Sequence, residues 1–227
     1  MTNLSLNACR SYLDAHTRMG ATEEHRDLPV VTMSREAGAG GVTVAQLLAD
    51  LLNGSSSKRN GCPWTIFDRN LIERVLADHQ LPKEIARYMP EDAAAFSAGA
   101  AVEELLGLHP SSWTLVQHTT DTILHLARMG NVILVGRGSN IIAGQCRNAF
   151  HVRLVAPLEL RIQRMAELNH LTQAEAARLV RKTDLARRRY VQIHFKADID
   201  DPLRYHAVFN TGLMSLETVA KGIANAI

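Results

Sequence analysis

Residues 30–49 of this 227-residue chain, VVTMSREAGAGGVTVAQLLA, combine an apolar run, a glycine-rich turn and a helical pattern of apolar residues. Val30, Val31 and Met33 are typical of a buried strand, and apolar residues recur at helical spacing from Val44 onward. A turn of this kind directs several backbone N–H groups and the positive end of a helix toward one point, which is a geometry that binds phosphate. The sequence therefore predicts a phosphate-binding loop formed by Gly38, Ala39, Gly40, Gly41, Val42 and Thr43.

This loop lacks the lysine and the hydroxyl residue that follow the last glycine in loops of the form G-x-x-x-x-G-K-[ST]. Gly41 and Val42 stand at those two places. Taken alone, the loop has a second interpretation as a structural strand-to-helix connection without a ligand. Arg35 precedes the glycines and could supply the missing positive charge, since a guanidinium donates two parallel hydrogen bonds to a phosphate. Its alternative role is an ion pair with Glu36 or Asp68.

Strands and helices alternate along the rest of the chain, which predicts an α/β fold with a doubly wound parallel five-stranded sheet. The four further strands are expected at 64–67, 132–135, 151–156 and 206–210. Thr172 and Glu175 form a capping box that predicts a helix over 173–189. We expect residues 1–28 to form an N-terminal helical extension and residues 29–227 to form one α/β domain, with a lid at about 158–200.

Polar residues follow three of these predicted strands, where the ligands of open parallel sheets bind. Asp68 follows the second strand and is a candidate to bind the acceptor or Mg²⁺ through water, although it could also cap a helix. Arg137, in G-R-G directly after VILV, is expected to bind an anionic ligand in preference to a structural ion pair. Asn210 and Thr211 follow the last strand.

Two basic helices follow the fourth strand. Arg161 and Arg164 share one helix face, and the next helix carries Lys182, Asp184, Arg187, Arg188 and Arg189. Between positions 178 and 189 six basic residues accompany one acid, in a chain whose net charge is only +2. A solvated surface is the usual explanation of such a run, but the position after the fourth strand favours a mobile lid over bound phosphates.

Composition narrows the possible functions. The small net charge argues against nucleic acid and membrane surfaces as partners. Three scattered cysteines and the absence of metal-ligand spacing predict no disulfide framework and no protein-bound metal, and they favour the cytoplasm as the compartment. A dinucleotide-binding oxidoreductase is discarded, because G-x-G-x-x-G would need glycine at Thr43.

Five stretches of the chain resemble the cytidylate kinase-like family, a branch of the P-loop nucleoside monophosphate kinases. They are VVTMSREAGAGGVTVAQLLADLL, IFDRNLIERVL, VILVGRGSNIIA, FHVRLVAPLELRIQRM and YHAVFNTGLMSLETVAKGI. They span most of residues 30–224, whereas 1–28 and 75–115 match poorly. Thr43 matches the second hydroxyl residue of a typical cytidylate kinase loop, and Val42 stands at the magnesium-ligand position.

The resemblance implies a P-loop kinase-like protein that uses ATP and Mg²⁺ to phosphorylate a nucleotide or another small phosphorylated substrate. It implies a nucleoside triphosphate at Gly38–Thr43, an acceptor monophosphate beside Arg137, and a lid that contains Arg161, Arg164 and Arg187. From the residues themselves we predict that Asp68 binds the acceptor and that Arg35, Arg161, Arg164 and Arg187 are catalytic. Lys182, Asp184, Arg188 and Arg189 belong to the implied lid. The alternative hypothesis is a non-catalytic nucleotide-binding or regulatory protein derived from a kinase. The sequence leaves the acceptor and the oligomeric state undetermined.

Overall fold

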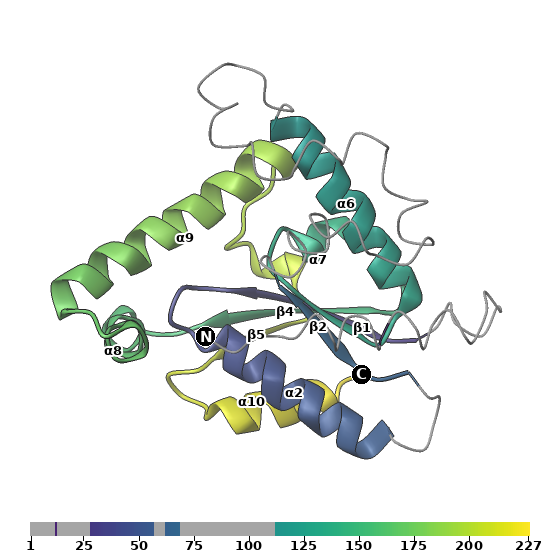
Figure 1. The fold of residues 1–227 in the computed structure, drawn as a ribbon, viewed down its shortest axis with the longest axis horizontal. Helices are drawn as coiled ribbons and strands as arrows, with labels where there is room; N and C mark the ends of the chain where they lie inside the picture. Colours follow the sequence, from purple (N-terminus) through teal and green to yellow (C-terminus); the bar gives the residue numbers. More distant parts are fainter. Residues whose placement is uncertain (1–11, 13–27, 57–61, 69–111) are drawn as a thin grey trace.

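The computed structural model describes residue 12 and residues 28–56, 62–68 and 112–227 (Figure 1). Five strands in these ranges form one sheet: β1 Val30–Arg35, β2 Thr65–Asp68, β3 Val132–Val135, β4 Ala149–Val155 and β5 Ala207–Asn210. Every pair of neighbours is parallel, in the order β2-β3-β1-β4-β5. The predicted five-stranded parallel sheet is therefore confirmed.

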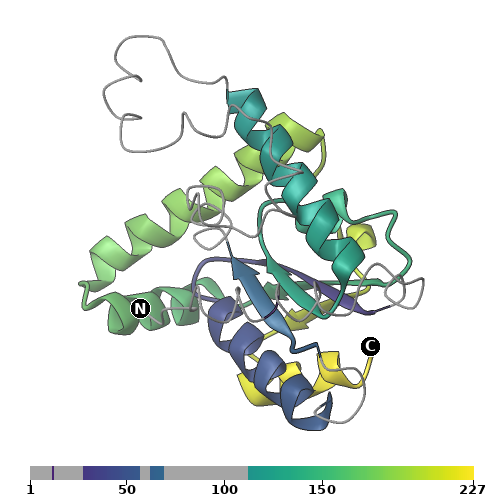
Figure 2. The same cartoon turned by 45° about the vertical axis from the view of Figure 1, so that its right-hand side comes forward.

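Helices cover both faces of the sheet (Figures 1 and 2). On one face α2 Gly41–Ser56 packs beside α10 Leu216–Ala224, and on the other lie α6 Ser112–Met129 and α7 Ser139–Ile142. After β4 come α8 Leu158–Asn169 and α9 Gln173–Phe195, which pack against each other, and then the short 3-10 helix η3 Pro202–Arg204. These three layers are the predicted doubly wound arrangement.

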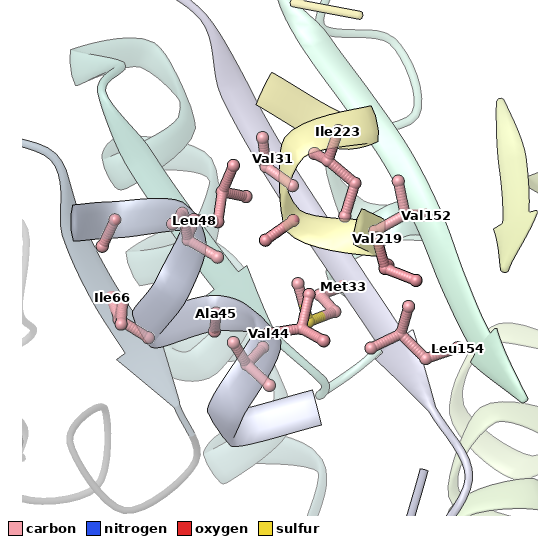
Figure 3. Packing of buried hydrophobic residues seen from close by; sticks show 14 of the residues in the cluster. Val31, Met33, Val44, Ala45, Leu48, Ile66, Val152, Leu154, Val219 and Ile223 are labelled. Atoms are coloured by element: carbon pink, nitrogen blue, oxygen red, sulfur yellow. The ribbon is translucent and has the colours of Figure 1, made fainter. Parts of the chain in front are cut away.

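Alternation along β1 divides the core between the two faces. Val31 and Met33 pack against the α2 and α10 side, in a cluster with Leu48 and Ile223 (Figure 3). Val30 packs on the opposite side, in the cluster that contains Ile123 of α6. Burying each of these large apolar side chains stabilises the fold by about 1.5–3 kcal/mol. Arg35 continues the alternation of residues 31 and 33, so its side chain starts on the α2 side of the sheet.

The helix that follows the capping box is longer than the sequence pattern predicts. Thr172 accepts a hydrogen bond from the Glu175 N–H, and the Glu175 carboxylate accepts one from the Thr172 N–H, so the predicted box is confirmed. The helix expected at 173–189 continues to Phe195 and ends at Lys196, whose φ of 51° is left-handed. The six additional residues place Tyr190 and Val191 against the carboxyl ends of the strands.

The predicted N-terminal extension lies outside the described residues except for Tyr12. Tyr12 is fully buried, and its ring meets Phe67 edge-on with centroids 5.7 Å apart. Its hydroxyl donates a hydrogen bond to the carbonyl of Gly130. This residue is therefore part of the core on the α6 side. Among the helices of the described residues, none has the length and apolar character needed to cross a membrane.

Candidate active site

The glycine-rich loop between β1 and α2 presents a group of backbone donors. Gly38 and Gly40 have φ values of 80° and 81°, a left-handed conformation that side chains disfavour. Within the described part of the chain, hydrogen-bond partners are lacking for the N–H groups of Gly38, Gly40, Gly41, Val42 and Thr43. Because these donors lie at the positive end of a 16-residue helix, they suit the oxygens of a phosphate chain.

The Arg35 side chain occupies space that is open because Gly41 and Gly136 have no side chains. A Cβ atom at Gly41 would lie 2.8 Å from the Cγ atom of Arg35, and a Cβ atom at Gly136 would overlap the guanidinium. Any side chain at position 41, lysine included, would therefore compete with Arg35 for the same space. A cationic side chain thus lies along the start of α2 although position 41 itself provides none.

The surroundings of Arg35 disfavour the positive charge of its guanidinium group, and a bound anion would offset this effect. Burial lowers the pKa of Arg35 to about 9, as does repulsion from Arg187 and Arg137, while attraction to Asp68 opposes the shift. The guanidinium is still charged at neutral pH. Burial also lowers the pKa of Arg187, against the opposing attraction of Asp184. Positive charges held together in this way favour a bound anion, which would relieve the repulsion.

These arginines line a cleft of about 480 Å³ between the carboxyl ends of β1 and β3 and one face of α9. The cationic lining residues are Arg35, Arg137, Lys182 and Arg187, and no described residue that lines the cleft carries a carboxylate. The cleft lies beside β1, where the order of the strands reverses, as expected for the ligand site of a doubly wound sheet. An anionic small molecule fits this charge and size.

Arg137 enters the cleft from a strained turn. Gly136, Arg137 and Gly138 have consecutive φ values of 88°, 56° and 70°, and a left-handed conformation is unusual for arginine. The guanidinium lies over the ring of Tyr190, with its carbon 5.4 Å from the centroid. Such backbone strain costs about 1–3 kcal/mol and is common at binding sites. The turn directs the Arg137 side chain to the wall formed by α9.

Asp184 of α9 contacts the glycine-rich loop. Its carboxylate accepts a hydrogen bond from the Ala37 N–H at 2.8 Å and pairs with Nη1 of Arg161 at 2.6 Å. One turn later, Arg187 donates from Nη1 to the carbonyl of Arg35 at 3.0 Å. Two residues of α9 thus hold this helix on the loop. The N–H group of Ala37, the first amide of the turn, already has the Asp184 carboxylate as its hydrogen-bond partner.

Arg161, a predicted catalytic residue, is buried and fully engaged by its neighbours. It donates to the carbonyls of Ala156 and Ala37 and lies 3.3 Å from the Glu36 carboxylate. Glu36 in turn accepts a hydrogen bond from the Ala156 N–H, which joins the loop to the end of β4. Arg161 does not line the cleft. Its observed contacts position the loop, and its catalytic role stays a prediction.

The described residues that line the cleft do not include the predicted Asp68, Arg164, Arg188 and Arg189. Arg164 donates two hydrogen bonds of 3.0 Å to Thr211, at the end of β5. Arg188 pairs with Asp200 at 2.7 Å, and Arg189 is exposed. Asp68 ends β2 and attracts Arg35 electrostatically. The roles assigned to these residues stay predictions as well.

Sequence reasoning missed several residues of the site. Asn140 and Tyr190 line the cleft, and Asp200 pairs with both Arg188 and the buried Arg153. Tyr190 lies one helical turn after Arg187, so helical spacing could have identified it. Arg153 occupies an apolar-looking strand and donates to Ser34 at 2.9 Å, a contact that no local pattern indicates.

The donors of the glycine-rich loop suit a magnesium nucleotide. The unsatisfied loop amides and the exposed Thr43 fit a polyphosphate. No group of three metal-ligating side chains occurs among the residues that the structure describes. Because Mg²⁺ in kinase sites binds mainly through the phosphates and water, this donor set remains compatible with a magnesium nucleotide.

Comparison with known proteins identifies the family. Residues 30–213 match the cytidylate kinase-like family, and the chain belongs to it. An uncharacterized protein from Eubacterium ventriosum ATCC 27560 is similar, with a TM-score of 0.64 and 17% identity over 88% of this chain and 98% of that chain. This similarity shows a common fold. No curated protein matches the chain.

Shikimate kinases are also among the similar structures. The enzyme from Acinetobacter baumannii has a TM-score of 0.47 and 18% identity, over 90% of this chain and 95% of that chain. The enzyme from Bacteroides thetaiotaomicron has a TM-score of 0.47 and 13% identity, over 87% of this chain and 97% of that chain.

Proposed function

We propose that this kinase-like protein transfers the γ-phosphoryl group of ATP to a nucleoside monophosphate or a similar small phosphorylated acceptor. The observation that carries the proposal is the position of Arg35, which lies where Gly41 and Gly136 leave space. A fixed cation at the start of α2 can serve the electrostatic role of the missing lysine. Phosphoryl transfer depends mostly on positioning and on neutralising charge, so the source of that cation matters less than its place.

The donor phosphates would bind the loop amides of residues 38–43. Magnesium, bound to those phosphates, would neutralise charge as the phosphoryl group moves. The chain's own contribution at this end is a set of N–H donors that need no rearrangement, since Gly38 and Gly40 already hold the turn open. Arg35 would contact the phosphates from the side of β1.

The acceptor phosphate would bind in the cleft among Arg137, Lys182 and Arg187. Apolar lining residues from α9, among them Leu179 and Val191, would exclude water from that space. The contacts of Asp184 and Arg187 with the loop support a role for residues 158–200 as a lid that closes over both ligands. We also propose that residues 29–227 act as one domain and that residues 1–28 are an extension of it.

The first test is ATP consumption in the presence of Mg²⁺, measured against a panel of nucleoside monophosphates that includes CMP and dCMP. We expect turnover that depends on one acceptor. In Arg35→Met, which keeps an unbranched but shorter side chain and removes its charge, kcat should fall about 10³-fold or more, the range for loss of a phosphate-directed arginine. Arg128→Met, at an exposed residue of α6 that belongs to neither the loop, the cleft nor the lid, is the matched control and should retain full activity.

A non-catalytic nucleotide-binding protein is the second candidate, and one contact favours it. Asp184 holds α9 on the loop through Ala37 and Arg161, so a nucleotide that binds the same loop would change this contact and could release the helix as a signal. Under this hypothesis calorimetry detects ATP binding, and no acceptor stimulates turnover. Arg35→Met then changes only the affinity for ATP. Turnover with one acceptor would exclude it.

A further inference from the structure

A second cavity lies away from the cleft, at the amino ends of β4 and β5. Its volume is about 520 Å³, and it is lined by the segment between α7 and β4, by His151 of β4 and by residues 203–206. The cleft of the proposed active site lies at the carboxyl ends of the strands, so the two spaces open at different ends of the sheet. They share one lining residue, Asn140 of α7.

Two buried polar side chains at this cavity each have a polar group without a hydrogen-bond partner in the described part of the chain. His151 is 7% exposed, and its Nδ1 atom lies 2.8 Å from the Thr32 hydroxyl, while Nε2 has no hydrogen bond there. Asn140 is 8% exposed, and its side-chain amide likewise has none among those residues. Buried polar groups in native proteins are normally satisfied, so both groups indicate that a ligand or water occupies the cavity.

The neighbouring His206 adds a hydrogen-bond donor of known tautomer. Its Nδ1 atom accepts the His151 N–H at 2.9 Å, so in the neutral ring the proton is on Nε2. The two imidazoles lie with centroids 5.0 Å apart. Burial, and repulsion from His206, lower the pKa of His151 to about 4, so His151 is neutral at physiological pH and contributes hydrogen bonding without charge.

The charge around the cavity is positive. Arg147 is exposed and has no ion-pair partner within the described residues. Arg204 pairs with Asp201 through Nε, at 3.4 Å, and its two Nη groups make no hydrogen bond with another described residue. No carboxylate belongs to the described residues that line the space. Two guanidinium groups beside the N–H donors of His206 and Asn140 suit a doubly charged oxyanion.

We propose that this cavity is a second ligand site that binds the phosphate group of a small phosphorylated molecule. Arg147 and Arg204 would contact the phosphate from the rim, and Nε2 of His206 and the amide of Asn140 would donate from the floor. The volume is within the range of small-molecule sites. A phosphate monoester matches the two arginines in charge better than a single carboxylate does. The proposal is independent of the proposed kinase function.

Histidine side-chain NMR tests this proposal, because no histidine is among the described residues that line the cleft. The full chain, labelled with ¹⁵N-histidine, is titrated with inorganic phosphate at constant ionic strength, and the His206 signals are identified by their loss in His206→Gln. We expect saturable shifts of the His151 and His206 ring nitrogens. The double variant Arg147→Ala/Arg204→Ala should weaken binding at least tenfold, and it should fold, since both side chains are exposed.

Arg137→Gly, in the cleft, is the matched control and should leave the histidine shifts unchanged. The proposal is overturned if the two rings do not respond, if the response is not saturable, or if the double variant binds phosphate as tightly as the parent chain. Loss of the shifts in Arg137→Gly would assign the anion to the cleft and would also overturn it. Tighter binding of succinate than of phosphate would refute the phosphate class.

Discussion

Gly41→Ala tests whether Arg35 replaces the missing lysine, because it adds a single methyl group against that side chain. The new Cβ would lie 2.8 Å from the Cγ of Arg35, so the arginine must move until the two atoms reach the 3.4 Å at which ordinary contact begins. Gly41 does not have a positive φ, so alanine fits its backbone. The substitution therefore displaces Arg35 by several tenths of an ångström and leaves the loop backbone in place.

The expected effects on stability and activity differ in size. Alanine in a helix is more favourable than glycine by about 0.5–1 kcal/mol, and a displaced arginine off its rotamer costs about 0.5–1.5 kcal/mol. These terms nearly cancel, so the free energy of unfolding should change by less than about 1 kcal/mol and Tm by less than about 4 °C. Misplacement of a catalytic group by about 1 Å can cost about 10²-fold in rate, and kcat should fall toward that range.

Two further glycine-to-alanine variants complete the assay, which combines thermal unfolding with acceptor-dependent ATP consumption. Gly54 lies in the same helix with nothing within 4 Å of a new Cβ, so Gly54→Ala should be more stable by about 0.5–1 kcal/mol and fully active. At Gly38 the new Cβ would overlap the backbone of Arg161 at a φ of 80°, so Gly38→Ala should be strongly destabilised. Full activity of Gly41→Ala, or destabilisation as large as that of Gly38→Ala, would refute the reasoning.

Three other predictions concern the contacts around the cleft and His151. Asp184→Asn weakens the ion pair with Arg161, whose other carboxylate partner is Glu36. The free energy of unfolding, measured by urea titration, should fall by about 1.5–3 kcal/mol. An unchanged urea midpoint would contradict a role of Asp184 in holding α9. Arg137→Gly removes the strain of an arginine in the left-handed conformation, so Tm should change little. The KM for the acceptor should rise at least tenfold, and an unchanged KM would place the acceptor elsewhere. The folded-state pKa of His151, about 4, lies below the ordinary histidine value of 6.5, so the unfolded chain binds the extra proton and stability should decrease as pH falls from about 6.5 to 4. His151→Gln should reduce that slope in denaturation measured across this range, and an identical slope would contradict it.

The sequence by itself determined the fold and predicted where the candidate site lies. Apolar runs such as VILV predict buried parallel strands because both faces of such a strand are covered. The glycines of the loop and the polar residues at or directly after the ends of β2 and β3 then predict the edge where a ligand would bind, since parallel strands end at the same side. These are local signals, carried by neighbouring residues, and they need no knowledge of distant contacts.

The tertiary structure decided what each charged side chain does. Arg161 and Arg187 look alike in sequence, yet Arg161 is buried among Glu36, Asp184 and backbone carbonyls, whereas Arg187 lines the cleft. Arg35 reaches its place only because Gly136, a hundred residues away, has no side chain. Ion pairs and close contacts between residues far apart depend on how helices and strands pack, and periodicity does not contain that information. The cavity at His151 has the same origin, because it forms where three separate segments meet.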